Sequence, residues 1–107
     1  MKIAIASLGE TLDSKVSPHF GRAPYFVFVE VENNEVRNVK AERNLLAQNH
    51  EHGAIPQMMI KNNVDLVISA GIGNNAKNHL EQAGVKLVQT QIITLKEALQ
   101  NLGIKVD

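Results

Sequence analysis

Short apolar runs separated by polar stretches divide the chain into a small number of expected elements. The runs at residues 2–6 and 64–70 are almost continuously apolar, which predicts strands buried on both faces. Residues 25–32 are aromatic and β-branched, and residues 35–41 continue this pattern after Asn33-Asn34. Because asparagine tolerates positive φ, we expect a tight hairpin turn there and an antiparallel pair of strands.

Helical spacing appears only in the second half of the chain. Residues 54–63 place apolar side chains at helical intervals, and Pro56 is compatible only with a first turn, so we expect this helix to start near residues 53–55. Residues 71–84 predict a glycine-rich turn followed by a helix that Gly84 ends. A short buried-type strand follows at residues 86–90.

A capping box predicts the last helix. Thr94 directly precedes "LKEALQNL" and Glu97 is its third residue, so the two stand three residues apart, and Gly103 follows as the expected end. The predicted order is therefore three strands, then helix, strand, helix, strand and helix. Crossover helices make parallel strand pairs. We expect an α/β fold with a mixed five-stranded sheet in the order 3-2-1-4-5, a ribonuclease H-like topology, with helices on both faces.

Length and composition fit one domain spanning residues 1–107. Apolar residues make up 44% of the 107, and 11 basic residues balance 11 acidic ones. The balance gives no sign of a nucleic-acid partner. No apolar run approaches the length of a membrane helix, and the short apolar start is unlike a signal peptide, so we expect a cytoplasmic protein with no membrane partner. The chain has no cysteine, which excludes thiolate ligands from this chain.

The predicted topology places a ligand site at the carboxyl ends of the two middle strands, where the chain connections diverge. The connection after residues 64–70 contains Gly71 and Gly73 before a helix N-terminus. The free N–H groups at such an end can donate hydrogen bonds to an anion. A tight turn without a ligand explains the same two glycines. The first strand carries no carboxylate, so the two-metal chemistry of a nuclease is not expected.

Histidines and one arginine are the other candidate ligand groups. His19 and Arg22 lie in the proline- and glycine-containing stretch "VSPHFGRAP" of residues 16–24. His50 and His52 stand two apart, a spacing at which an extended chain could direct both to one metal; a solvated loop is the other interpretation. Arg22 can clamp a carboxylate or phosphate, or pair with a nearby acid such as Glu10 or Asp13.

His79 has a different setting from the other three histidines, because it lies within the predicted helix of residues 71–84. We interpret it as a surface or packing residue of that helix. No nucleophile, base and orienting partner can be assembled from the sequence, so we do not expect an enzyme.

Three blocks of the chain resemble the dinitrogenase iron–molybdenum cofactor biosynthesis family. They are "VSPHFGRAPYFVFVEVE", "HEHG" before a helix, and "VDLVISAGIGNNAKNHLEQAGVKLV". The family includes NifX-type nitrogen fixation accessory proteins, the C-terminal domain of NifB-type proteins and small stand-alone members, which this chain is most similar to. The resemblance implies a ribonuclease H-like fold and binding of the iron–molybdenum cofactor or an iron–sulfur precursor.

The resemblance also implies site residues. The cofactor-binding positions that match the family pattern are Ser17, His19, Phe20, Gly21, Arg22, His52, Gly53, Gly71 and Gly73. Metal ligands would come from His19, His50 and His52.

The expected function is thus a non-catalytic carrier of a metal cluster, with cluster-assembly proteins as partners and a monomeric or weakly dimeric state. No cofactor is expected to be needed for folding. The alternative function is a regulatory module that binds a small anion or nucleotide at residues 71–75. A third interpretation is an adaptor that binds a protein partner.

Overall fold

The computed structural model describes residues 1–45 and 54–106, and the strands form one mixed sheet. The sheet order is β3-β2-β1-β4-β5, as predicted. β1 pairs antiparallel with β2 and parallel with β4, and β4 pairs parallel with β5. The elements are β1 (Lys2–Ser7), β2 (Tyr25–Glu32), β3 (Glu35–Arg43), α1 (Ala54–Lys61), β4 (Leu66–Ser69), α2 (Asn74–Gln82), β5 (Lys86–Gln89) and α3 (Leu95–Asn101).

The hairpin between β2 and β3 turns at the predicted asparagine pair. Asn33 and Asn34 have φ values of 54° and 61°, the left-handed conformation that a two-residue hairpin turn requires at both positions. β3 ends at Arg43, two residues later than predicted, because Arg43 pairs with Tyr25 at the start of β2. The antiparallel pairing of this hairpin is confirmed.

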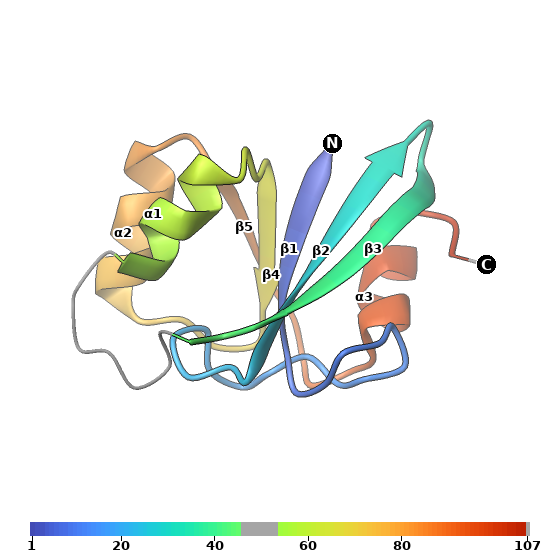
Figure 1. Cartoon of the computed structure of the whole chain (residues 1–107), viewed down its shortest axis with the longest axis horizontal. Coiled ribbons are helices and arrows are strands. Elements are labelled where there is room, and N and C mark those ends of the chain that lie inside the picture. Colours follow the sequence, from blue (N-terminus) through green and yellow to red (C-terminus); the bar gives the residue numbers. More distant parts are fainter. Residues whose placement is uncertain (46–53, 107) are drawn as a thin grey trace.

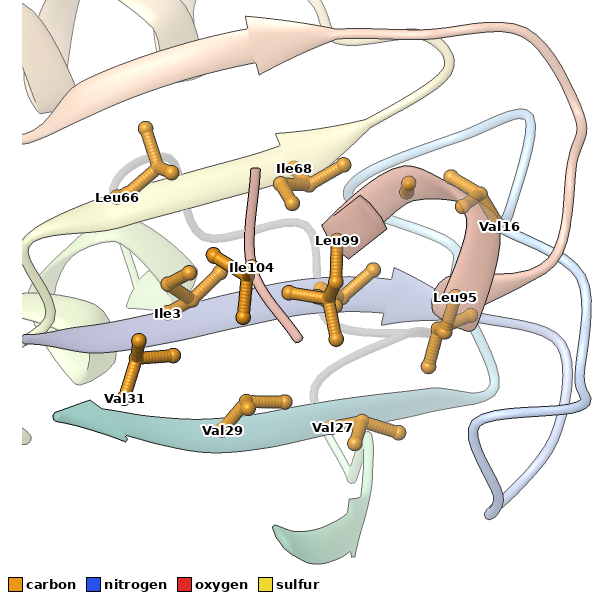
Figure 2. Close-up of a cluster of buried hydrophobic side chains, with 12 residues drawn as sticks. Ile3, Val16, Val27, Val29, Val31, Leu66, Ile68, Leu95, Leu99 and Ile104 are labelled. Atoms are coloured by element: carbon orange, nitrogen blue, oxygen red, sulfur yellow. The ribbon is translucent and has the colours of Figure 1, made fainter. Parts of the chain in front are cut away.

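Helices cover both faces of the sheet, which confirms the predicted layers (Figure 1). On the face of α3, side chains from β1, β2 and β4 meet the helix in one buried cluster, shown in Figure 2. Ile3 and Ile5 of β1 point to this side, and Leu95 and Leu99 of α3 lie against them with no exposed surface. Alternation along β1 therefore sends the large residues to the face of α3.

The opposite face packs against α1 and α2. Here β1 presents the small residues Ala4 and Ala6, which leave room for Phe26 of β2 and for Phe20 from the loop that follows β1. The two phenylalanine rings meet edge to face, with centroids 5.4 Å apart. Phe20 thus ties that loop into the core of the domain.

Two further boundaries differ from the prediction between α1 and β4, where the helix ends earlier than predicted and β4 begins at Leu66 rather than residue 64. The helix ends at Lys61 rather than residue 63, because Asn63 adopts φ 58° and the Asn62 side chain donates to the Met58 carbonyl at 2.7 Å. Val64 belongs to this turn, and its N–H donates to the Met59 carbonyl at 3.1 Å. It is buried all the same, and so its apolar side chain resembles the start of a strand in the sequence.

The last helix begins as predicted. The Thr94 hydroxyl accepts from the Glu97 N–H at 3.1 Å, and the Glu97 carboxylate accepts from the Thr94 N–H at 3.3 Å. Gly103 follows the helix with φ 81°. No helix in the described part of the chain is long and apolar enough to span a membrane.

Candidate functional site at the carboxyl ends of the strands

Three loop segments gather where β1, β4 and β5 end, along the lower side of Figure 1. We call residues 16–24, 70–75 and 89–94 together the rim. The 16–24 segment crosses the ends of β1 and β4: the Ser17 N–H donates to the Ala6 carbonyl at 2.8 Å, and the Ala70 N–H donates to the Ser17 carbonyl at 3.2 Å. The crevice expected between these two strands is therefore filled by the chain itself.

The same segment contacts the other two rim segments. The Phe20 N–H donates to the Gly71 carbonyl at 2.9 Å, and the Val16 N–H donates to the Ile93 carbonyl at 2.8 Å. These bonds place the stretch that contains His19 directly beside the Gly71 turn. The predicted neighbourhood of the two segments is confirmed.

Buried serine hydroxyls brace the turns at the rim. Ser17 Oγ donates to the His19 carbonyl at 2.9 Å and accepts from the His19 N–H at 3.2 Å. Ser69 Oγ likewise donates to the Gly71 carbonyl at 2.7 Å, and Ser7 Oγ donates to the Gly9 carbonyl at 2.7 Å. Ser17 was among the predicted site residues, whereas Ser7 and Ser69 were not. The signal was a serine that ends a buried strand two residues before a glycine.

Gly71 is fixed by a close backbone approach. A Cβ at this position would meet the carbonyl oxygen of Pro18, whereas a Cβ at Gly73 would meet nothing within 4 Å. The first glycine of the turn therefore lets the 16–24 segment lie against the end of β4. The second has no such steric role.

His19 and Arg22 lie exposed on the outer side of the rim, as does Gly21. Within residues 1–45 and 54–106 the ion pairs join Arg37 to Glu35 and Lys40 to Glu42, both along β3. One of the two interpretations of Arg22 was an ion pair with Glu10 or Asp13. That ion pair is not present among the described residues. Arg22 is exposed, and no acid within residues 1–45 and 54–106 pairs with its guanidinium.

Asn44 holds the far end of the Arg22 loop and was missed in the sequence. Its side-chain amide donates to the Ala23 carbonyl at 2.8 Å and to the Gly21 carbonyl at 3.4 Å, and its N–H donates to the Pro24 carbonyl at 2.9 Å. Asn44 is buried directly after β3. An amide at the end of a charged strand gave no pattern by which sequence reasoning could connect it to residues 21–24.

The N-terminus of α2 completes the rim. Gly73 is its N-cap and supplies no side-chain cap, and the first turn contains no acidic residue. The three rim segments as a whole contain no Asp or Glu, whereas they contain His19 and Arg22. Uncapped N–H groups and the positive end of the helix dipole add to this cationic character.

Comparison with known proteins agrees with the resemblance found in the sequence. The model of the family described as dinitrogenase iron–molybdenum cofactor matches residues 1–103. The chain belongs to this family.

Solved relatives share both the family fold and its length. The protein PH0822 is 30% identical with a TM-score of 0.85, and the match covers 100% of this chain and 95% of that one. A Thermotoga protein described as a candidate NifB protein is 33% identical with a TM-score of 0.80, over 95% and 86% of the two chains. The apo form of the orange protein from Desulfovibrio gigas is 30% identical with a TM-score of 0.82, over 94% and 85%.

The family-implied residues fall into three groups in the structure. His19, Gly21 and Arg22 are exposed at the rim with Gly73, and Gly71 lies beside them with its carbonyl bonded to Phe20. Phe20 and Ser17 are buried beneath, where the ring packs in the core and the hydroxyl braces the turn. The third group, His50, His52 and Gly53, lies outside the described residues, and its predicted ligand role stays a prediction.

The histidines that are described do not form a metal centre on their own. Across residues 1–45 and 54–106, no three His, Cys, Asp or Glu side chains come together as metal ligands. His79 is exposed on α2, which confirms its reading as a surface residue of that helix. Among the described residues, the rim offers a ligand His19, Arg22 and backbone N–H groups.

Proposed function

We propose that this member of the dinitrogenase iron–molybdenum cofactor family binds an iron–sulfur or iron–molybdenum cluster, or its precursor, at the rim and carries it without catalysis. One observation supports this above the others. An exposed arginine and an exposed histidine are held on a braced loop beside an uncapped helix N-terminus, and the rim segments contain no acid.

Each rim component suits an anionic cargo of this kind. The Arg22 guanidinium offers several N–H donors to a carboxylate or to cluster sulfur, and the first N–H groups of α2 add donors nearby. An imidazole such as His19 is a neutral ligand to iron or molybdenum. With no cysteine in the chain, no thiolate competes for the metal, which favours release to an acceptor.

The support for a carrier over an enzyme is the character of the same residues. Ser7, Ser17 and Ser69 are buried and their hydroxyls bond to loop carbonyls, so they are not free nucleophiles. His19 and Arg22 offer binding and orientation, without the base and orienting partner of a catalytic set. Transfer to a cluster-assembly protein is the step we assign to this chain.

Anaerobic titration tests the proposal directly. Iron–molybdenum cofactor and a water-soluble [4Fe–4S] cluster are each added to the protein, and binding is followed by the cluster absorbance. Arg22→Ala should weaken binding roughly tenfold or more, because a hydrogen bond to a charged group contributes about 1.5–3 kcal/mol. His19→Ala should also weaken binding and should change the absorbance of the bound cluster, because a metal ligand is lost.

Matched variants elsewhere on the surface serve as controls. Arg37→Ala removes an exposed arginine of β3, and His79→Ala removes an exposed histidine of α2. Both should bind as the natural chain does. Unchanged affinity in Arg22→Ala and His19→Ala would place the cluster elsewhere and refute the proposal.

A small anion or nucleotide is the second candidate ligand, and the uncapped start of α2 is the observation that favours it. Thermal unfolding with inorganic phosphate and a set of nucleotides distinguishes the two. A nucleotide present at about 100 times its dissociation constant should raise the stability by about 2.7 kcal/mol. No response to any nucleotide, combined with cluster binding, would leave the carrier function alone.

A further inference from the structure

The two edges of the sheet are protected to different degrees. Outside β3, the C-terminal segment bonds to the hairpin: the Lys105 N–H donates to the Asn34 carbonyl at 2.7 Å, and the Val36 N–H donates to the Lys105 carbonyl at 3.1 Å. The exposed charges of Arg37 and Lys40 cover the rest of that strand. Charged side chains and a covering segment are the usual protection of an edge against further pairing.

β5 forms the other edge, and it is less protected than β3. No segment within residues 1–45 and 54–106 pairs with its outer side. Its sequence is Lys-Leu-Val-Gln, so its only charge is at the first residue. The strand therefore offers a short row of backbone groups for pairing.

The direction of these groups follows from the bonds to β4. The Lys86 N–H donates to the Asp65 carbonyl and the Thr90 N–H donates to the Ser69 carbonyl, each at 3.1 Å. In a parallel strand alternate residues direct both backbone groups to the same side. The N–H and C=O groups of Leu87 and Gln89 consequently point away from the sheet.

A hollow of about 580 Å³ lies along this edge. Leu66 and Val88 contribute apolar surface to its lining, and Lys77 and Glu81 of α2 also line it. These two charged residues are four positions apart, so they stand on one side of the helix, a turn from each other. The edge thus carries an apolar centre and a pair of opposite charges beside it.

We propose that β5 pairs with β5 of a second copy of this chain, antiparallel about a two-fold axis at Val88. Leu87 of each copy then faces Gln89 of the other, and two such pairs make four backbone hydrogen bonds, which use every outward group of these residues. Lys86 faces the uncharged Thr90 of the second copy. The interface is isologous, as a closed dimer requires.

The charges on α2 are the reason for choosing a second copy over a foreign strand. A two-fold axis reverses the direction of the second α2, so Lys77 of one copy approaches Glu81 of the other, and the reverse pair forms at the same time. The two charges of one α2 therefore match the opposite charges of the second α2. A contact of one short strand and one helix turn is smaller than a standard interface, so we expect a dissociation constant on the order of 100 µM.

Sedimentation equilibrium from about 10 µM to about 1 mM protein tests the dimer over the range that brackets this constant. Gln89→Pro removes the outward N–H and no bond to β4, so it should raise the dissociation constant at least about tenfold. Gln89→Ala is the matched control, because it keeps the N–H, and it should change the constant less than about twofold.

Charge exchange supplies a test that does not alter the strand. Lys77→Glu and Glu81→Lys each place like charges across the axis and should weaken the dimer about tenfold at low salt, whereas the double exchange should restore it. Circular dichroism checks that each variant is folded. A monomer at 1 mM, or a dimer that Gln89→Pro leaves unchanged, would overturn the proposal.

Discussion

The two ends of the central strands differ in how their charges are arranged. At the end where β1 begins, the Lys2 N–H donates to the Asp65 carboxylate at 2.8 Å, and the Met1 amine donates to the Val31 carbonyl at 2.9 Å. Acidic and basic side chains line one hollow of about 420 Å³ there, with Glu30 and Arg37 among them. At the rim, His19 and Arg22 lie among segments that contain no acid.

This difference shows that the rim segments themselves present no acid to compete with an anion. At the end where β1 begins, which we call the far end, the basic side chains already have acidic neighbours. An anionic ligand there would meet repulsion as well as attraction. At the rim the backbone supplies the structure through serine hydroxyls and main-chain bonds, and the cations are left for a ligand. These bonds that hold the rim use no charged side chain, whereas the far end uses the Asp65 carboxylate, and this separates the two ends.

Replacing Gly71 should produce the largest effect on this comparison. In Gly71→Ala the new Cβ meets the Pro18 carbonyl, so the backbone must move, and we expect a loss of about 1–3 kcal/mol in the free energy of unfolding. Urea denaturation measures it. Gly73→Ala has open space and is the matched control, with an expected loss below about 1 kcal/mol from the weaker N-cap.

Hydrogen exchange locates the change caused by Gly71→Ala. The N–H groups of Ser17 and Phe20, which bond across the rim, should exchange faster, whereas that of Lys2 at the far end should not. Equal losses in the two glycine variants would show that the contact with Pro18 does not hold the rim.

Asp65→Ala acts on the far end and should have a smaller effect. It removes the acceptor of the Lys2 N–H in an exposed position, so we expect a loss of about 0.5–1.5 kcal/mol in the free energy of unfolding. Cluster affinity should stay as in the natural chain, because the site lies at the opposite end. A change in affinity as large as that of Arg22→Ala would erase the distinction between the ends.

The smallest effect concerns Glu97, the first acid after the rim segments. Its pKa is lowered mainly by the hydrogen bond from the Thr94 hydroxyl, then by that from the Thr94 N–H, with a contribution from the charge of Lys15. A lowered pKa in the folded state means that ionised Glu97 stabilises the fold above the usual glutamate pKa. This contribution is lost as pH falls through the folded-state value.

Glu97→Gln should therefore reduce the loss of folding stability that occurs as the pH falls. Thermal unfolding between neutral and acidic pH measures this loss of stability in the natural chain and the variant. Thr94→Ser keeps the hydroxyl, so its stability should fall with pH as in the natural chain. If Glu97→Gln left the profile unchanged, the carboxylate would not be held by the cap.

Much of the fold could be predicted because each element carries a local cause. Asn33-Asn34 alone specify a turn with two positive φ values, and the Thr94–Glu97 spacing specifies a helix start. The sheet order followed from crossovers and from the apolar character of β1 and β4. The errors near Val64 arose because a buried residue in a turn and a buried residue in a strand look alike in sequence.

The site could be predicted only in part, because its construction depends on contacts between distant segments. His19, Arg22 and the Gly71 turn were named, and the structure brings the two segments together. That Gly71 is needed for the Pro18 carbonyl, and that Asn44 holds residues 21 and 23, depend on the folded path of the loop. No spacing in the sequence encodes such contacts.

The bond between the Val16 N–H and the Ile93 carbonyl has a consequence for biosynthesis. The rim needs both β1 and residues 89–94, so a ribosome must release both of these segments before the rim can form. Contacts between segments so far apart in sequence also slow folding. Under the proposed function, an incomplete chain would therefore lack the rim at which a cluster is expected to bind.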